Sequence, residues 1–121
     1  MLKEAIISNS VKAIGSHTFS GCCSLISIIF PYALTSVGEY AFLDCATLKE
    51  ITLPDSITTI GDSTFQRCRF LRKIIIPHSV TSIGKQIFFG CNNLKKIIIP
   101  YNTTEKFEKL LPEYKDKLVE Q

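Results

Sequence analysis

The chain has 121 residues, a hydrophobic content of 45% and a formal net charge of +3. This length and hydrophobic content suit one folded domain with a buried core and exclude an intrinsically disordered chain. The charge is too small by itself to indicate nucleic acid or an anionic membrane as the partner. No stretch approaches the roughly 18 consecutive apolar residues of a membrane-spanning helix, so no transmembrane segment is predicted.

The N-terminal residues MLKEAIISNSVKAIG lack the basic-then-apolar layout of a secretory signal. Within them, Ala5 and Ile7 lie in register with strands that we predict further along the chain. We therefore expect a partial first coil whose short strand contains these two residues.

A 23-residue period organises the chain as far as residue 100. Four residue types mark it most clearly: Gly15, Gly38, Gly61 and Gly84; Phe19, Phe42, Phe65 and Phe88; Cys22, Cys45, Cys68 and Cys91; Pro31, Pro54, Pro77 and Pro100. Tandem copies of one structural unit give such a pattern, and a single copy cannot bury its apolar residues alone. The sequence therefore predicts identical coils that stack on one another.

Each unit contains the pattern L-x-x-I-x-I, with some substitution at its last position, and this pattern alternates and then stops at proline. Such alternation predicts a short strand with one buried face. We place these strands within residues 25–30, 48–53, 71–76 and 94–99, aligned as a parallel sheet at a spacing of about 4.8 Å. The residues after each glycine have room for one helical or 3₁₀ turn.

The full unit, P-x-S-V-T-S-I-G-x-x-A-F-x-x-C-x-x-L-x-x-I-x-I, resembles the repeat of the BspA-like leucine-rich repeat family over residues 5 to 100. The resemblance implies a curved solenoid at the cell surface or secreted, which binds host or matrix proteins. It implies no catalytic residues.

The last stretch, PYNTTEKFEKLLPEYKDKLVEQ, abandons the period. Asn102 and Glu105 have the spacing of a capping box, and the apolar residues that follow fall at helical spacing. We predict a helical C-terminal cap, with a kink or two short helices at Pro112. The first coil has no equivalent cap, so its open strand edge predicts either a homodimer through the N-terminal coil or an upstream region that covers it.

The five cysteines form no C-x-x-C pair, and their odd number argues against a disulfide framework. We expect the four periodic cysteines to be packed and unreactive, because reactive thiols need an electropositive, partly exposed setting. A column of thiols presents them in a line rather than as a tetrahedron, so no metal site is predicted. Cys23 has no cysteine at the equivalent positions of other units and is the expected exposed thiol.

No catalytic residue and no cofactor are predicted. His17 and His78 are the only histidines, and the residues at equivalent positions vary, which is typical of solvent-exposed sites. A thiol-dependent enzyme would have to pair one of them with a buried cysteine without an oxyanion loop, and it stays a remote alternative.

Alternation along the strands predicts columns of side chains that face solvent. They combine isoleucines, lysines at the C-terminal coils and two tyrosines just after the strands, a mixture that suits a protein partner. The predicted partner-binding residues are Ile29, Tyr32, Ile75, Ile98, Tyr101, Lys73, Lys96 and His78. Self-association through the same stripe, or isoleucines that serve only β-propensity, remain as alternatives.

Residues 67–96 contain seven basic residues and no acidic one. This basic zone gives a second alternative, a glycan or membrane polyanion as ligand, whereas no nucleic-acid motif accompanies the charge.

Together, these patterns predict an α/β repeat protein. Residues 1–100 would form a leucine-rich-repeat solenoid of four full repeats and a partial N-terminal strand, with a parallel sheet on the concave face, and residues 101–121 a helical cap. The expected function is a non-enzymatic scaffold, a piece of a surface or secreted adhesin that recognises a host extracellular or matrix protein.

Overall fold

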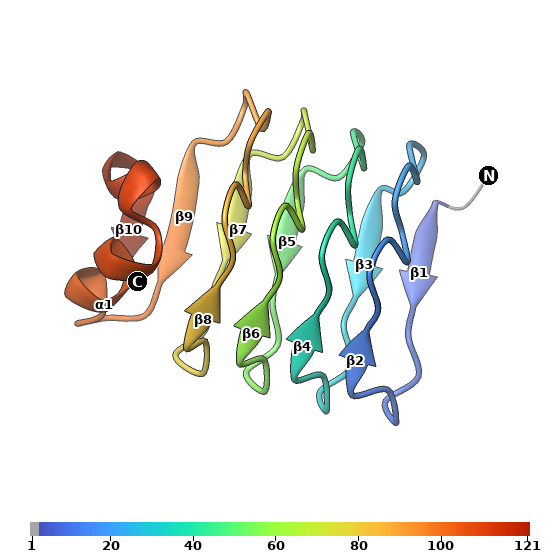
Figure 1. Ribbon diagram of the computed structural model, residues 1–121, viewed down its shortest axis with the longest axis horizontal. Helices are drawn as coiled ribbons and strands as arrows, with labels where there is room; N and C mark the ends of the chain where they lie inside the picture. The colour runs from blue at the N-terminus through green and yellow to red at the C-terminus, as the bar shows by residue number, and fades with distance from the viewer. Residues whose placement is uncertain (1–2) are drawn as a thin grey trace.

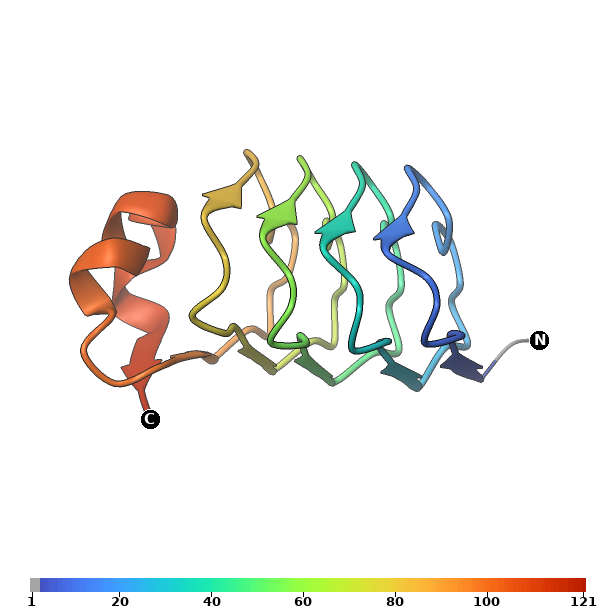
Figure 2. The ribbon, with the colours of Figure 1, turned by 90° about the horizontal axis from the view of Figure 1, so that it is seen from below.

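A computed structural model, which describes residues 3–121, shows coils stacked in one direction along the chain (Figure 1). Each full coil has a longer and a shorter strand, which lie on opposite sides of the stack (Figure 2). The longer strands are β1 (Glu4–Ile6), β3 (Ser27–Ile29), β5 (Glu50–Thr52), β7 (Lys73–Ile75) and β9 (Lys96–Ile99). The shorter strands are β2 (Ala13–Ile14), β4 (Ser36–Val37), β6 (Thr59–Ile60) and β8 (Ser82–Ile83).

All strand pairs are parallel, and the pairs between successive repeat coils keep the 23-residue register, as Glu50 opposite Lys73 and Lys73 opposite Lys96 show. The predicted stacking of like residues is therefore confirmed. The shorter strands form a second sheet, β2-β4-β6-β8, that the sequence analysis did not predict. The longer strands pair as β1-β3 and as β5-β7-β9, with the C-terminal strand β10 (Leu118–Glu120) beside β9, so their ladder is interrupted between β3 and β5.

The phenylalanine column forms the spine of the core. The ring of Phe65 stacks on Phe42 at a centroid distance of 5.5 Å and on Phe88 at 6.1 Å. The leucines that precede the longer strands and the isoleucines at the middle of these strands pack around this column and are buried: Leu48, Leu71, Leu94, Ile51, Ile74 and Ile97. Phe19, in the first coil, is only partly buried because one side of its ring has no neighbouring coil.

Hydrogen-bonded turns follow each periodic glycine, in place of the helical or 3₁₀ turn for which the spacing left room. One residue in each turn has a positive φ, between 55° and 63°: His17, Tyr40, Ser63 and Gln86. A right-handed helix cannot pass through this conformation, so the chain bends toward the phenylalanine without forming a helix.

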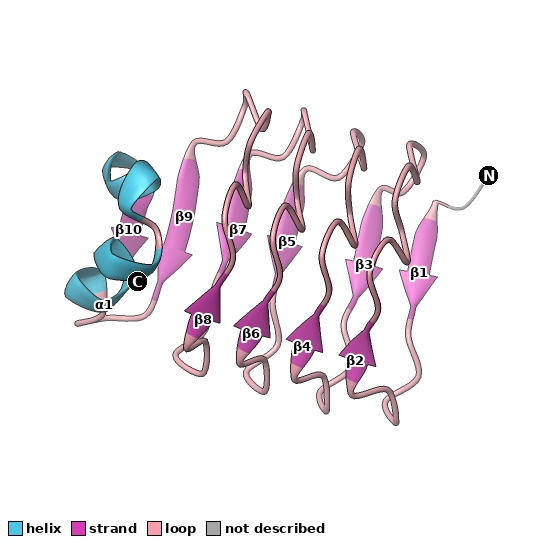
Figure 3. Ribbon diagram, in the orientation of Figure 1, coloured by secondary structure: helices cyan, strands magenta, loops and turns pink. Residues whose placement is uncertain are grey.

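The C-terminal segment has a helix α1 (Thr104–Leu110), a 3₁₀ helix η1 (Pro112–Lys117) and a strand β10 (Leu118–Glu120) (Figure 3). The break at Pro112 agrees with the predicted pair of short helices. Tyr114 closes the phenylalanine column, with its ring edge-on to Phe88 at 5.3 Å. The strand β10 was not predicted, and it continues the sheet beside β9. The division into residues 1–100 and 101–121 stays a prediction.

The predicted capping box at Asn102 and Glu105 is wrong. Asn102 lies in the left-handed region with φ 65°, and the N-cap position is occupied by Thr103 without a side-chain capping bond. The cap comes instead from β10, where the Glu120 carboxylate accepts hydrogen bonds from the Thr104 hydroxyl at 2.6 Å and the Thr104 N–H at 3.1 Å. These two bonds lower the pKa of Glu120 below its ordinary value.

Candidate protein-binding surface

The predicted partner-binding residues lie along the sheet of longer strands and just after it. Tyr32 is 75% exposed, Tyr101 is 72% exposed and Ile29 is 62% exposed. Ile29 faces away from the core because side chains alternate along β3, whereas Tyr32 and Tyr101 lie in the turns that follow β3 and β9.

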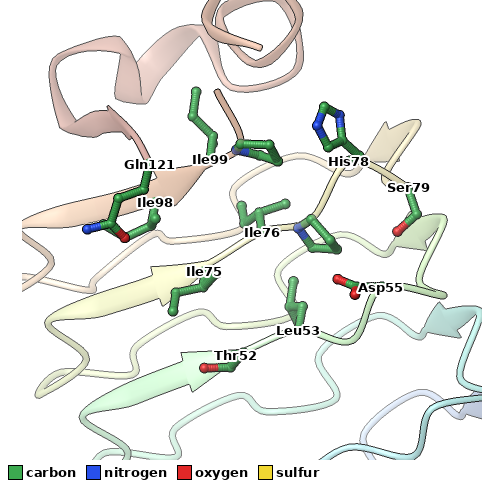
Figure 4. A pocket seen from close by; sticks show the side chains of 12 residues that line it. Thr52, Leu53, Asp55, Ile75, Ile76, His78, Ser79, Ile98, Ile99 and Gln121 are labelled. Carbon is green, nitrogen blue, oxygen red and sulfur yellow. The ribbon is translucent and has the colours of Figure 1, made fainter. Parts of the chain in front are cut away.

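A groove of about 410 Å³ lies at the C-terminal ends of β5, β7 and β9. Three predicted residues line it: Ile75, His78 and Ile98. Figure 4 shows them on successive strands and turns, together with Gln121 from the chain end. The structure thus gathers part of the predicted set around one largely apolar depression.

The prediction that Ile98 belongs to the exposed surface is wrong, because this residue is only 6% exposed. β10 pairs with β9 and sets Val119 directly opposite Ile98, so the exposed stripe ends on Val119 instead. Val119 and Gln121 are surface residues that the sequence analysis missed. The alternation of Leu118, Val119 and Glu120 was the available signal, but it is shorter than a recognisable strand pattern.

Ion pairs between neighbouring coils reduce the net positive charge of the basic zone, residues 67–96. Lys73 lies 3.3 Å from the Glu50 carboxylate and Arg67 lies 2.9 Å from that of Asp44. Both pairs are partly exposed, so they add little stability, but they offset two of the seven basic charges. Lys96 is exposed and forms no ion pair among residues 3–121.

The periodic cysteines line the interior and donate hydrogen bonds between coils. The thiols of Cys45, Cys68 and Cys91 each reach the carbonyl of a phenylalanine in the preceding coil, at 3.1, 3.2 and 3.0 Å. All three residues are buried, whereas Cys22 is partly exposed in the first coil. Burial raises the pKa of Cys45 to about 12. The hydrogen bond of Cys68 with Cys91, together with burial, raises the pKa of Cys68.

We expect a thiol reagent to modify Cys23 first in the native protein at neutral pH, because it is exposed. Cys45 should react only on unfolding, since a pKa raised to about 12 keeps it protonated and unreactive near pH 7. Titration with a chromogenic disulfide, followed by mass spectrometry of the modified peptides, measures the order. Rapid native modification of Cys45, Cys68 or Cys91 contradicts a structural role for these thiols.

Neither histidine takes part in the hydrogen bonds that the buried cysteines donate between coils. His17 is exposed and stacks on Tyr40 at a centroid distance of 5.1 Å, and His78 is exposed at the groove. In the described part of the chain, no three His, Cys, Asp or Glu side chains gather as metal ligands would. None of the helices described is long and apolar enough to span a bilayer.

Coils of one length, parallel strands in register and a ladder of buried Leu, Ile, Phe and Cys define a leucine-rich repeat solenoid. The family model "BspA type Leucine rich repeat region" matches residues 1–111 in six copies. The chain belongs to this BspA-type leucine-rich repeat family, whose members are generally scaffolds rather than enzymes.

Solved bacterial structures share the fold. The leucine-rich repeat protein TpLRR of T. pallidum is 34% identical with a TM-score of 0.79, and the match covers 80% of this chain and 45% of that one. A leucine-rich repeat protein from Bacteroides ovatus is 32% identical with a TM-score of 0.72, over 84% of this chain and 28% of that one.

A third structure, a leucine-rich cell surface protein from Faecalibacterium prausnitzii, is 27% identical with a TM-score of 0.76, over 89% of this chain and 34% of that one. The chain therefore spans less than half the length of each of these proteins. No curated protein matches the chain.

Proposed function

We propose that the chain is a non-enzymatic protein-binding module of a surface or secreted protein, and that it recognises a host extracellular or matrix protein in an adhesive role. The observation that carries the proposal is the groove of about 410 Å³ at the ends of β5, β7 and β9, with exposed Tyr101 just beyond β9. Tyrosine and aliphatic anchors supply most of the energy at protein interfaces.

The backbone of this surface is preorganised. The coil of β5 and β6 is joined to that of β7 and β8 through parallel strand pairs on both sides of the core, and β7 pairs with β9, so a partner meets a rigid ribbon. Little conformational entropy is then lost on the scaffold side when the complex forms.

Binding to a panel of immobilised matrix proteins (collagen, laminin and fibronectin), measured by surface plasmon resonance, tests the proposal. We expect one of these proteins to bind. The double variant Tyr101→Ala, Lys96→Glu should weaken that binding by about a hundredfold, because it removes an aromatic anchor and reverses a charge at the rim of the interface. Lys96 is preferred to Lys73 for this variant because reversing Lys73 would set two carboxylates against each other at Glu50.

Lys12→Glu is the matched control, since Lys12 is exposed and precedes β2, in the opposite sheet. Its affinity should equal that of the unmodified chain. If no panel protein binds, or if the double variant binds as well as the control, the proposed function is wrong.

The polyanion alternative has less support, because Arg67 and Lys73 in the basic zone already pair with carboxylates. It predicts heparin affinity that falls steeply as salt is raised, whereas an apolar protein contact depends on salt far less. The thiol-dependent enzyme has no support from the buried position of Cys45, Cys68 and Cys91.

Self-association through the first coil stays a proposal. Partly exposed apolar side chains at that end, Phe19, Ile28 and Phe30, support it, since their counterparts in the next coil are buried. Light scattering at a series of concentrations distinguishes monomer from dimer.

A further inference from the structure

A second depression lies at the opposite edge of the longer strands from the groove. The strands β3, β5, β7 and β9 begin at the upper edge in Figure 1 and end at the lower edge. At the beginning of the strands, a depression of about 440 Å³ is lined by Ile26, Thr47, Lys49 and Phe70. A smaller one of about 280 Å³ adjoins it and shares Lys49 and Phe70.

Two large apolar side chains stand in this depression. Ile26 and Phe70 are each 55% exposed. At the position equivalent to Phe70, Thr47 and Asn93 donate hydrogen bonds to backbone carbonyls of the preceding coil. Phe70 replaces that polar link with an exposed ring, which has an unfavourable contact with water unless another molecule covers it.

Basic side chains form a row beside the two apolar ones, at the equivalent position of several coils. The N–H of Arg72 donates to the carbonyl of Lys49 at 2.8 Å, and the N–H of Lys95 donates to that of Arg72 at 2.9 Å. In the first coils, the N–H of Ile26 donates to Lys3 at 2.7 Å in the same way. Four of the five residues at this position are therefore basic.

These four cations are available to a ligand. Within residues 3–121, none of Lys3, Lys49, Arg72 and Lys95 forms an ion pair, whereas Arg67 and Lys73 close by do. All four are exposed. Their like charges repel one another and raise the local positive potential, so an anionic ligand would be attracted to this edge.

The depression also coincides with the interrupted ladder between β3 and β5. Ile26 immediately precedes β3 and Lys49 immediately precedes β5, so the space of about 440 Å³ opens across the interruption. An apolar side chain of a ligand would enter between Ile26 and Phe70 while its acidic groups contact Lys49 and Arg72.

We propose that this edge, defined by Lys3, Ile26, Lys49, Phe70, Arg72 and Lys95, binds an extended acidic peptide segment that carries an aromatic or large aliphatic side chain. The cations select the acidic residues and the Ile26–Phe70 depression selects the apolar one. A polyanion without apolar side chains would contact only the row of basic side chains. This surface is independent of the groove beyond β5, β7 and β9 and does not rest on the function proposed for it.

A fluorescein-labelled synthetic peptide in which aspartates alternate with phenylalanine and leucine is the probe, and fluorescence anisotropy measures its affinity. We expect Arg72→Glu to weaken binding by about tenfold, because it reverses a central charge of the row. Phe70→Ala should weaken it by a similar factor, because it removes the apolar contact. Lys12→Glu and Tyr101→Ala, which change other surfaces, should leave it unchanged.

A second peptide with serine in place of aspartate, and heparin, serve as comparison ligands. The serine peptide should bind at least about tenfold more weakly, and heparin should compete without any contribution from Phe70. Circular dichroism and melting temperature of each variant establish that it is folded.

Three results overturn the proposal. The aspartate peptide does not bind; the serine peptide binds equally well; or Phe70→Ala, folded like the unmodified chain, leaves the affinity for the aspartate peptide unchanged. The last result, with heparin binding that depends on Arg72, would assign the edge to polyanions instead.

Discussion

Replacing Phe65 by Ala lowers the free energy of unfolding by about 4 kcal/mol, the usual cost of removing a buried aromatic ring. Phe65 is fully buried and stacks on a phenylalanine on each side, at 5.5 and 6.1 Å. The coil of β7 and β8 is fixed by strand pairing in two sheets, and the coil of β3 and β4 by the pairing of β4 with β6, so neither can easily collapse into the cavity.

Urea denaturation followed by circular dichroism measures the change, with Phe70→Ala as the matched control. Phe70 is 55% exposed and should cost less than about 1 kcal/mol. Equal losses for the two variants would show that the phenylalanine column is not the main support of the stack.

The 23-residue period predicted the stacking, the register and the interior cysteines because each depends on many copies of one residue. The second sheet escaped prediction for a physical reason. Its strands, such as Ser36–Val37, are two residues long, too short for alternation to show. They form because the neighbouring coils present the same segment in the same register.

The errors of prediction cluster at the C-terminus, where the period stops and each feature depends on one contact. β10 covers Ile98, and Glu120 in that strand caps α1. Neither contact leaves a repeated signal in the sequence. The helical spacing of Leu118 with Tyr114 predicted helix for a residue that pairs with Ile97 in the sheet instead.

The sequence predicted which columns of residues are exposed on the candidate surface, but not where its ion pairs and grooves lie. Strand alternation identified Ile29 as exposed, and the variable column just after the strands identified Tyr32 and Tyr101. The ion pair between Arg67 and Asp44 joins residues 23 apart, so a linear count of charges reads the segment as a uniform basic zone. The grooves depend on how far neighbouring coils separate, which a repeat pattern does not record.

Gly61→Ala is expected to lower the free energy of unfolding by about 2–3 kcal/mol, through crowding of backbone against backbone. A methyl group at Gly61 would lie 2.8 Å from the amide nitrogen of Glu39 and 2.9 Å from the carbonyl carbon of Gly38. Both contacts are with the preceding coil, and Gly61 itself donates its N–H to Val37 at 2.8 Å. The coil can therefore relieve the clash only by moving away from its neighbour, which would weaken the parallel pairing of β4 with β6.

Gly15→Ala is the matched control at the equivalent position of the first coil, where the nearest atom to a new methyl group is the Thr18 hydroxyl oxygen at 3.5 Å. This variant should be neutral, or more stable by up to about 1 kcal/mol, because alanine restricts the unfolded chain. Thermal and urea unfolding of both variants compare them directly. The contrast isolates close stacking as the reason for glycine, since a requirement from the turn alone would destabilise both variants equally.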